Sequence, residues 1–100
     1  MGVRTDIKLV YEKQSKIYLY SHWDEAETLK ETIKDVLKRK LRWDDNAYLA
    51  RMIFSAIVKE DIDGETGYGI SLEPMGDSEV VVDLVKQTVD GMSYDDFINL

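Results

Sequence analysis

The chain has 100 residues, of which 44% are hydrophobic, and it contains no cysteine. This length and apolar content predict a single domain, residues 1–100, with a core large enough to fold without cross-links. The absence of cysteine excludes disulfides, thiolate metal sites and a cysteine nucleophile. No apolar run approaches the roughly 20 residues of a membrane-spanning helix. We therefore expect an intact cytoplasmic chain without a signal peptide or membrane contact.

The net charge of −7 is distributed unevenly along the chain. Residues 1–59 carry 12 basic and 9 acidic side chains, whereas residues 60–100 carry 1 basic and 11 acidic ones. We expect one strongly negative part of the surface, which suits a basic protein partner and argues against direct nucleic-acid binding. The basic cluster at residues 38–42 is interpreted as helix-end electrostatics rather than as a phosphate site.

Two strands are predicted at the start of the chain. Residues 3–11 alternate between β-forming and charged side chains, which is typical of a half-buried strand. Residues 16–23 are rich in β-branched and aromatic side chains, and the polar turn between the two segments predicts an antiparallel hairpin. Tyr18, Tyr20 and His22 share one face of the second strand. We expect that face to contact something, such as the protein's own C-terminus.

Two helices are predicted next. The first starts at Asp24, where Asp24 and Glu27 resemble a capping box, and its apolar stripe ends at Leu41. The second, residues 42–58, is the most apolar long segment and has apolar side chains at helical spacing, with Asp44 or Asp45 as its N-cap. We predict that this second helix is central, sandwiched between the first helix and the sheet.

The remaining pattern completes an α+β fold. Residues 68–73 and 79–84 are predicted as strands separated by a turn at residues 74–78, and the later strand could extend to Val89. A short helix capped by Ser93 is predicted to end the chain. The order ββααββα predicts a four-stranded antiparallel sheet with two antiparallel helices packed on one face and a short C-terminal helix.

Three segments resemble a known family when they are taken together. They are KIYLYSHW at residues 16–23, RWDDNAYLARMIF at 42–54 and DGETGYGIS at 63–71. They are similar, in matching order, to motifs of a family of small uncharacterised proteins encoded by tailed phages and prophages. Residues 24–26 depart from the glycines of that family, and the chain after residue 74 has no counterpart. The resemblance implies a phage or mobile-element origin and a host cytoplasm, but no activity and no catalytic residues.

Several residues with chemical potential have a simpler structural explanation. His22 is the single histidine and has no identifiable nucleophile or second base, while Asp44 and Asp45 are better explained as caps than as paired carboxylates. The DIDGE segment at 61–65 has the wrong spacing for a calcium loop, and GETGYG at 64–69 lacks the Lys-Ser/Thr of a phosphate loop. We predict no catalytic residue, no metal and no cofactor, and hence no enzyme.

The best candidate binding site combines aromatic side chains that have polar tips with one arginine. Such groups stack on flat ligands or anchor protein interfaces, and here they are Tyr20, His22, Trp23, Trp43, Tyr48, Arg51 and Tyr68. In the structural alternative, Trp43 and Tyr48 pack between the two helices and Arg51 pairs with Asp44 or Asp45.

These observations predict a non-catalytic binding protein. Small phage proteins of this size are often accessory factors that bind and disable a host component. The function is inferred here by analogy with those proteins. The predicted partner is a host protein with a basic surface, such as a defence component, met through the acidic surface. The alternative is a protein that sequesters a nucleotide-like small molecule with the aromatic and arginine residues. A homodimer that covers the aromatic sheet face is a further alternative.

Overall fold

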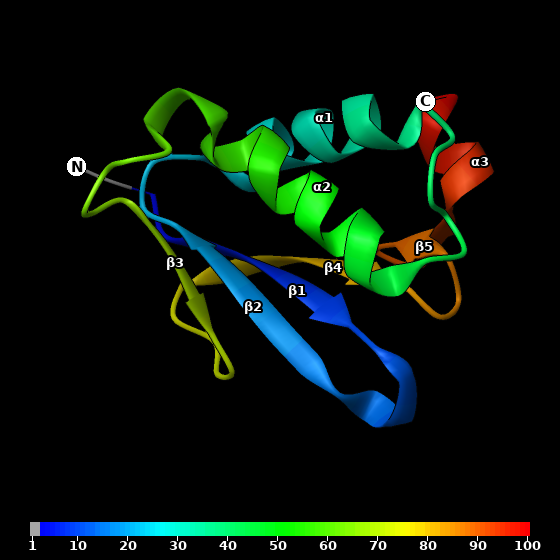
Figure 1. Cartoon of the computed structure of the whole chain (residues 1–100), viewed down its shortest axis with the longest axis horizontal. Helices are drawn as coiled ribbons and strands as arrows, with labels where there is room; N and C mark the ends of the chain where they lie inside the picture. The colour runs from blue at the N-terminus through cyan, green and yellow to red at the C-terminus, as the bar shows by residue number, and fades with distance from the viewer. Residues whose placement is uncertain (1–2) are drawn as a thin grey trace.

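The computed structural model describes residues 3–100, so the first two residues of the predicted domain lie outside the described part. The chain forms one six-stranded sheet with the order β3-β2-β1-β4-β5-β6, together with three α-helices. In chain order the elements are β1 (Thr5–Val10), η1 (Glu12–Gln14), β2 (Lys16–Ser21), α1 (Ala26–Leu37), α2 (Asn46–Val58), η2 (Lys59–Asp61), β3 (Tyr68–Ser71), β4 (Ser78–Asp83), β5 (Thr88–Val89), β6 (Met92–Ser93) and α3 (Tyr94–Ile98). Figure 1 shows α1 and α2 over one face of the sheet, with α3 beside β5. The α+β class is confirmed.

The prediction of a four-stranded antiparallel sheet is wrong in two respects. β1 pairs in parallel with β4, with Ile7 opposite Val80 and Leu9 opposite Val82, and β5 and β6 add two short antiparallel strands at the far edge. β5 and β6 contain two residues each, which is too few for an alternating pattern to be recognised. The parallel pairing arises because residues 72–77 do not form a hairpin turn. They carry the chain past β2 and β1 to the other side of the sheet.

This crossover segment, residues 72–77, is held to the sheet face opposite the helices. The buried Asp6 carboxylate accepts the backbone N–H groups of Met75 and Gly76, each at 2.9 Å. The Arg4 guanidinium donates to the Met75 carbonyl at 2.9 Å and to the Tyr20 hydroxyl at 3.3 Å. Because Asp6 and Tyr20 are cross-strand partners, both lie on this outer face. The predicted contact of the tyrosine face is therefore made by the crossover segment and not by the C-terminus.

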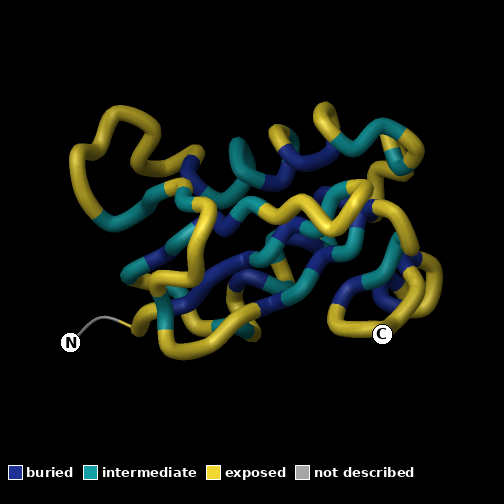
Figure 2. Tube along the Cα trace, turned by 90° about the horizontal axis from the view of Figure 1, so that it is seen from below, coloured by how far each residue is buried: buried dark blue, intermediate teal, exposed yellow. Residues whose placement is uncertain are grey.

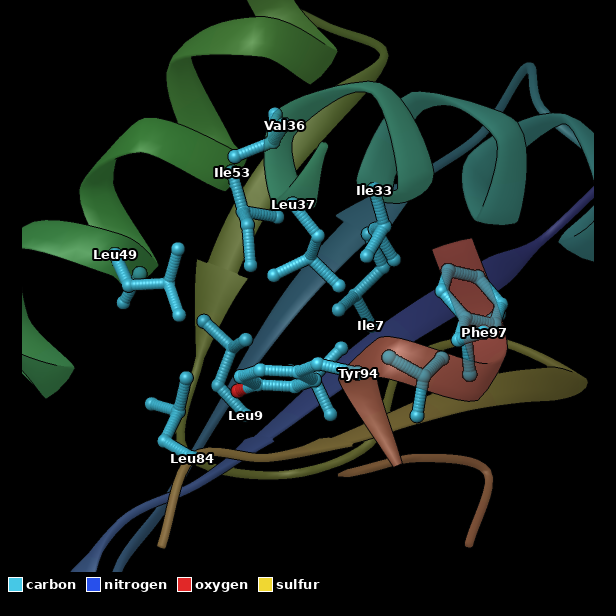
Figure 3. Close-up of a cluster of buried hydrophobic side chains, with 14 of the residues drawn as sticks. Ile7, Leu9, Ile33, Val36, Leu37, Leu49, Ile53, Leu84, Tyr94 and Phe97 are labelled. Atoms are coloured by element: carbon cyan, nitrogen blue, oxygen red, sulfur yellow. The ribbon is translucent and has the colours of Figure 1, made fainter. Parts of the chain in front are cut away.

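The prediction that α2 is the central helix is wrong, because α1 occupies that place. α1 packs against α2, α3 and β4. In α2, Leu49 and Ile53 are fully buried as predicted, but Phe54 and Ile57 are only partly buried. Figure 3 shows side chains of both helices meeting those of β1 and α3 in one core. Since α3 covers the other flank of α1, α2 lies at the margin of the helix layer and keeps one apolar side accessible.

The helix ends agree with the sequence at two caps and differ at two other points. Asp45 caps α2 by accepting the Tyr48 N–H at 3.1 Å, and Ser93 caps α3. Asp24 does not cap α1, which begins after Glu25 without a side-chain cap. α1 also ends at Leu37, so Leu41 is exposed in the connection to α2. Within residues 3–100, every helix is too short or too polar to cross a lipid bilayer.

Candidate functional site

The seven residues predicted as a binding site do not form one cluster. Four of them, Tyr20, His22, Trp23 and Tyr68, lie where β2 ends and β3 begins. Trp43 and Tyr48 lie at the other end of α2, and Arg51 projects from the exposed side of that helix. The structure therefore places the predicted residues at three separate points.

At the end of β2, the imidazole of His22 is engaged with its neighbours. Its Nδ1 lies 2.7 Å from the Tyr20 hydroxyl, which also accepts a hydrogen bond from Arg4. The His22 ring meets the Trp23 indole edge to face, with the ring centroids 5.3 Å apart. Tyr20 and His22 come together because residues two apart share a face of a strand. This arrangement orients the imidazole but brings no nucleophile to it.

The start of β3 is fixed tightly against the same residues. The backbone N–H of His22 donates to the Gly67 carbonyl at 2.8 Å, and the Trp23 indole lies on Gly67. A Cβ at Gly67, where φ is +97°, would collide with that indole. The Tyr68 hydroxyl donates to the Asp24 carboxylate at 3.3 Å. Burial and the negative charge of Asp24 raise the pKa of Tyr68. Asp24 is thus used to join β3 to the β2–α1 connection rather than to cap a helix.

The second group is largely structural. Trp43 donates its indole N–H to the Leu37 carbonyl at 3.2 Å, and its ring meets Tyr94 edge to face, with the centroids 5.1 Å apart. Tyr48 is exposed, and the Arg42 guanidinium covers its ring at 5.0 Å from the centroid. Trp43 thus follows the structural alternative, whereas Tyr48 does not pack between the helices.

Neither Arg51 nor the recess beside Trp43 forms a binding site for a flat ligand. The Arg51 guanidinium lies 3.4 Å from the Ser55 hydroxyl within α2, so the predicted ion pair with Asp44 or Asp45 is absent from residues 3–100. An open recess of about 490 Å³ at the α1–α2 connection is lined by Lys40, Arg42, Trp43, Asp44 and Asp45. Its two cations face two carboxylates, so the recess carries little net charge. In the described chain, no three acidic or histidine side chains lie close enough together to hold a metal ion.

A surface that the sequence analysis missed lies between α2 and the β3 edge of the sheet. We call this surface the β3 groove. It consists of two neighbouring recesses that share Phe54 and measure about 210 and 190 Å³. The first is lined by Leu9, Tyr11, Ile17, Leu19, Ala47, Ala50, Arg51, Phe54 and Ile70, and the second by Phe54, Ser55, Val58, Asp61, Ile62, Gly64 and Tyr68. The apolar alternation of β3 was visible in the sequence, but its position at the edge depends on strand order, which no local pattern reveals.

Large apolar side chains are exposed in the β3 groove, at Ile62 and Ile70, and at the two ends of β3, at Trp23 and Leu72. The exposed fractions are 73% for Ile62, 58% for Ile70 and 76% for Leu72, and 56% for Trp23 at the start of β3. Figure 2 shows the exposed loops of the chain in yellow and the buried strands and helix faces in dark blue. The groove is therefore an accessible apolar surface rather than a gap inside the core.

The carboxylates of residues 60–100 do not form the single negative flank that the sequence predicted. Four of them lie in the exposed run of residues 60–65, which precedes β3. Asp95 and Asp96 lie on α3, at the opposite end of the molecule in Figure 1. The reason is topological, since residues 60–100 supply both edge strands of the sheet. The acidic run at residues 60–65 is the part of this charge that adjoins the β3 groove.

Comparisons with known proteins give no relative for this chain. No protein-family model matches it, and no curated protein or solved structure is significantly similar to it. The resemblance to phage proteins stays a prediction, and a function has to be argued from the surface itself.

Proposed function

We propose that this protein is a non-catalytic binding protein, a phage-type accessory factor that inhibits a host protein by contact through the β3 groove. The observation that carries the proposal is the exposure of Ile62 and Ile70 in the β3 groove, with the exposed Trp23 and Leu72 at the two ends of β3. Trp23 lies on Gly67, next to the start of β3, and lines neither recess. Tyr68 and Ile62 line one recess, and Phe54 joins it to the recess at Ile70. Contiguous exposed apolar surface marks interaction sites.

The charge beside the groove favours a protein partner with basic residues. The acidic run at residues 60–65 repels phosphate groups and attracts lysine and arginine, which speeds association with a basic surface. The nucleotide-sequestering alternative finds no comparable support. Trp43 packs on Tyr94, and the candidate aromatic and arginine residues lie at three separate points, so they do not surround one ligand.

The test is affinity capture from a bacterial lysate, followed by reconstitution with the purified captured protein. We expect one dominant partner whose binding weakens as salt increases and is reduced by Trp23→Ala and Ile62→Lys. Val85→Lys is the matched control, because Val85 is 52% exposed in the turn between β4 and β5, away from the groove. Capture of no specific partner, or equal binding by all variants, would refute the proposal.

Thermal-shift measurements with a panel of nucleotides distinguish nucleotide sequestration from protein binding. A nucleotide in large excess over its Kd raises the melting temperature by mass action, and we expect no nucleotide to do so. A saturable shift with one nucleotide would favour sequestration over protein binding.

A further inference from the structure

Building on this proposed function, we propose that the partner is bound by strand addition at β3. The bound element is an extended protein segment with apolar residues at alternate positions and lysine or arginine at both ends. It would pair with β3 as a seventh strand of the sheet, with its alternate apolar side chains against the β3 groove.

The backbone of β3 is arranged to accept another strand. β3 is an edge strand whose one neighbour is β2. The His22 N–H bonds the Gly67 carbonyl, which makes these two residues a hydrogen-bonded pair. Hydrogen-bonded and non-hydrogen-bonded pairs alternate along an antiparallel ladder, so the N–H and C=O groups of Tyr68 and Ile70 point away from β2. An exposed row of this kind is a template for pairing with another chain.

The hydrogen bonding of β2 supports the same alternation. Tyr11 N–H donates to the Ser15 carbonyl at the end of the β1–β2 pair. Counting along this ladder assigns Ile17, Leu19 and Ser21 to β1 and leaves Tyr18 and Tyr20 to bond β3. The hydrogen bonds at two separate places in the sheet therefore give the same result: the backbone N–H and C=O groups that point away from β2 are those of Tyr68 and Ile70.

The side chains explain why the added segment should alternate. Ile70 lies opposite Leu19, on the face covered by the helices, and lines the same recess as Phe54. A residue opposite Ile70 on an added strand would point to that same face, beside α2. Gly69 points to the other face, where an added Cβ would meet nothing within 4 Å. No internal packing therefore requires this glycine, and it leaves the outer side of the edge bare.

The charges select a basic segment over a second copy of this chain. The acidic run at residues 60–65 precedes β3, and the exposed Glu73 follows it. If two copies paired antiparallel through β3, the acidic run of each would lie near Glu73 of the other. Like charges in such proximity destabilise strand pairing, and charged residues are a common protection of sheet edges. A segment with lysine or arginine at both ends turns this repulsion into attraction.

A synthetic peptide tests the inference directly. The probe has ten residues, with valine and threonine alternating between lysines at both ends, and its control replaces the lysines with glutamate. We expect peptide binding to slow hydrogen exchange at the amides of Tyr68 and Ile70, while Gly69 and Ser71 are already protected in the free protein. We expect the glutamate peptide to bind about tenfold more weakly or worse. No slowing at Tyr68 and Ile70 with about 1 mM lysine peptide, a weak-binding range, would overturn the inference.

Variants of the edge provide the second test. Ile70→Lys and Leu72→Lys each replace an exposed side chain and should leave the fold intact. Each should weaken peptide binding by about tenfold, whereas Val85→Lys should bind as wild type. If both edge variants bind the peptide as tightly as the wild-type protein, strand addition is refuted. It is also refuted if the wild-type protein sediments as a dimer and Ile70→Lys is a monomer.

The two proposals can fail separately. If a captured partner binds Ile70→Lys as tightly as wild type but loses affinity with Trp23→Ala, the proposed function stands and strand addition is refuted. If the lysine peptide binds at β3 but no lysate partner is found, the edge chemistry stands and the proposed function is refuted.

Discussion

Replacing Tyr94 with phenylalanine should make the protein more stable. Tyr94 is fully buried, and its hydroxyl has no hydrogen-bond partner among residues 3–100. Figure 3 shows its ring inside the core formed by α1, α2 and β1. A buried polar group without a partner costs about 1–3 kcal/mol. Phenylalanine keeps the edge-to-face contact with Trp43 and leaves a small void in place of the hydroxyl, so the expected net gain is about 1 kcal/mol.

The same substitution should change the response to alkaline pH. Burial, together with the negative charge of Asp83, raises the pKa of Tyr94 well above its ordinary value. Above about pH 10 the unfolded chain releases this proton and the folded chain retains it. Unfolding is then favoured as pH rises, with a loss of up to about 1.4 kcal/mol per pH unit from this group. Tyr94→Phe should lack this component and lose stability less steeply.

Urea denaturation at pH 7 and at intervals up to pH 11 measures both effects. A gain of about 1 kcal/mol corresponds to an increase of about 4–8 °C in melting temperature for a domain of this size. Tyr48→Phe is the control, since the Tyr48 side chain is exposed. The free energy of unfolding of this variant should differ from that of the wild type by less than about 0.5 kcal/mol. A Tyr94→Phe protein that is less stable by about 1 kcal/mol or more, with an unchanged alkaline slope, would refute the reasoning by showing that the hydroxyl is satisfied in the folded state.

Four further substitutions test the fold around the site by denaturation. Asp6→Ala leaves two backbone N–H groups of the crossover segment without their acceptor and should cost about 2–4 kcal/mol, whereas a loss below about 0.5 kcal/mol would show that the segment is held in another way. Gly67→Ala should destabilise by more than about 1 kcal/mol, because φ is positive and the Trp23 indole occupies the Cβ position. Gly69→Ala should be neutral or slightly stabilising, and equal losses for the two glycines would contradict the assigned conformations. Trp43→Ala should cost about 3 kcal/mol of stability. Under conditions where the variant is fully folded, it should bind the partner as tightly as wild type. A loss of binding by the folded variant would show that Trp43 contacts the partner.

The local elements were predictable because their signals are local. The alternation in residues 3–11 and the helical spacing in residues 42–58 correctly indicated a strand and a helix. Asp45 and Ser93 are caps because short polar side chains reach the free N–H groups of the first turn. Asp24 shows the limit of this logic. It has the right spacing for a cap, but the tertiary structure places the Tyr68 hydroxyl and the Ser21 side chain within its reach.

The arrangement of the elements was not predictable from the same patterns. Residues 74–78 contain proline, glycine and aspartate, which indicate a turn equally well whether the next strand pairs with its predecessor or crosses the sheet. The crossover segment is held by the buried Asp6 carboxylate, which accepts the Met75 and Gly76 N–H groups. The alternating pattern of residues 3–11 instead predicts that Asp6 faces solvent. The aromatic candidates were chosen by residue type, and their separation by the length of α2 follows from topology. The β3 groove was missed for the same reason, because the sequence gives no sign of which strand lies at an edge.

The parallel pairing of β1 with β4 also has a consequence for how the chain is made. The two strands at the middle of the sheet are separated in the chain by β2, both long helices, β3 and the crossover segment. A nascent chain emerging from the ribosome can form β1, β2 and α1 early, but its central ladder must wait for residues 78–83. Such distant pairing raises contact order and slows folding. The exposed apolar edge of β3 is therefore synthesised before the β1–β4 ladder is able to form, while the middle of the sheet is still incomplete.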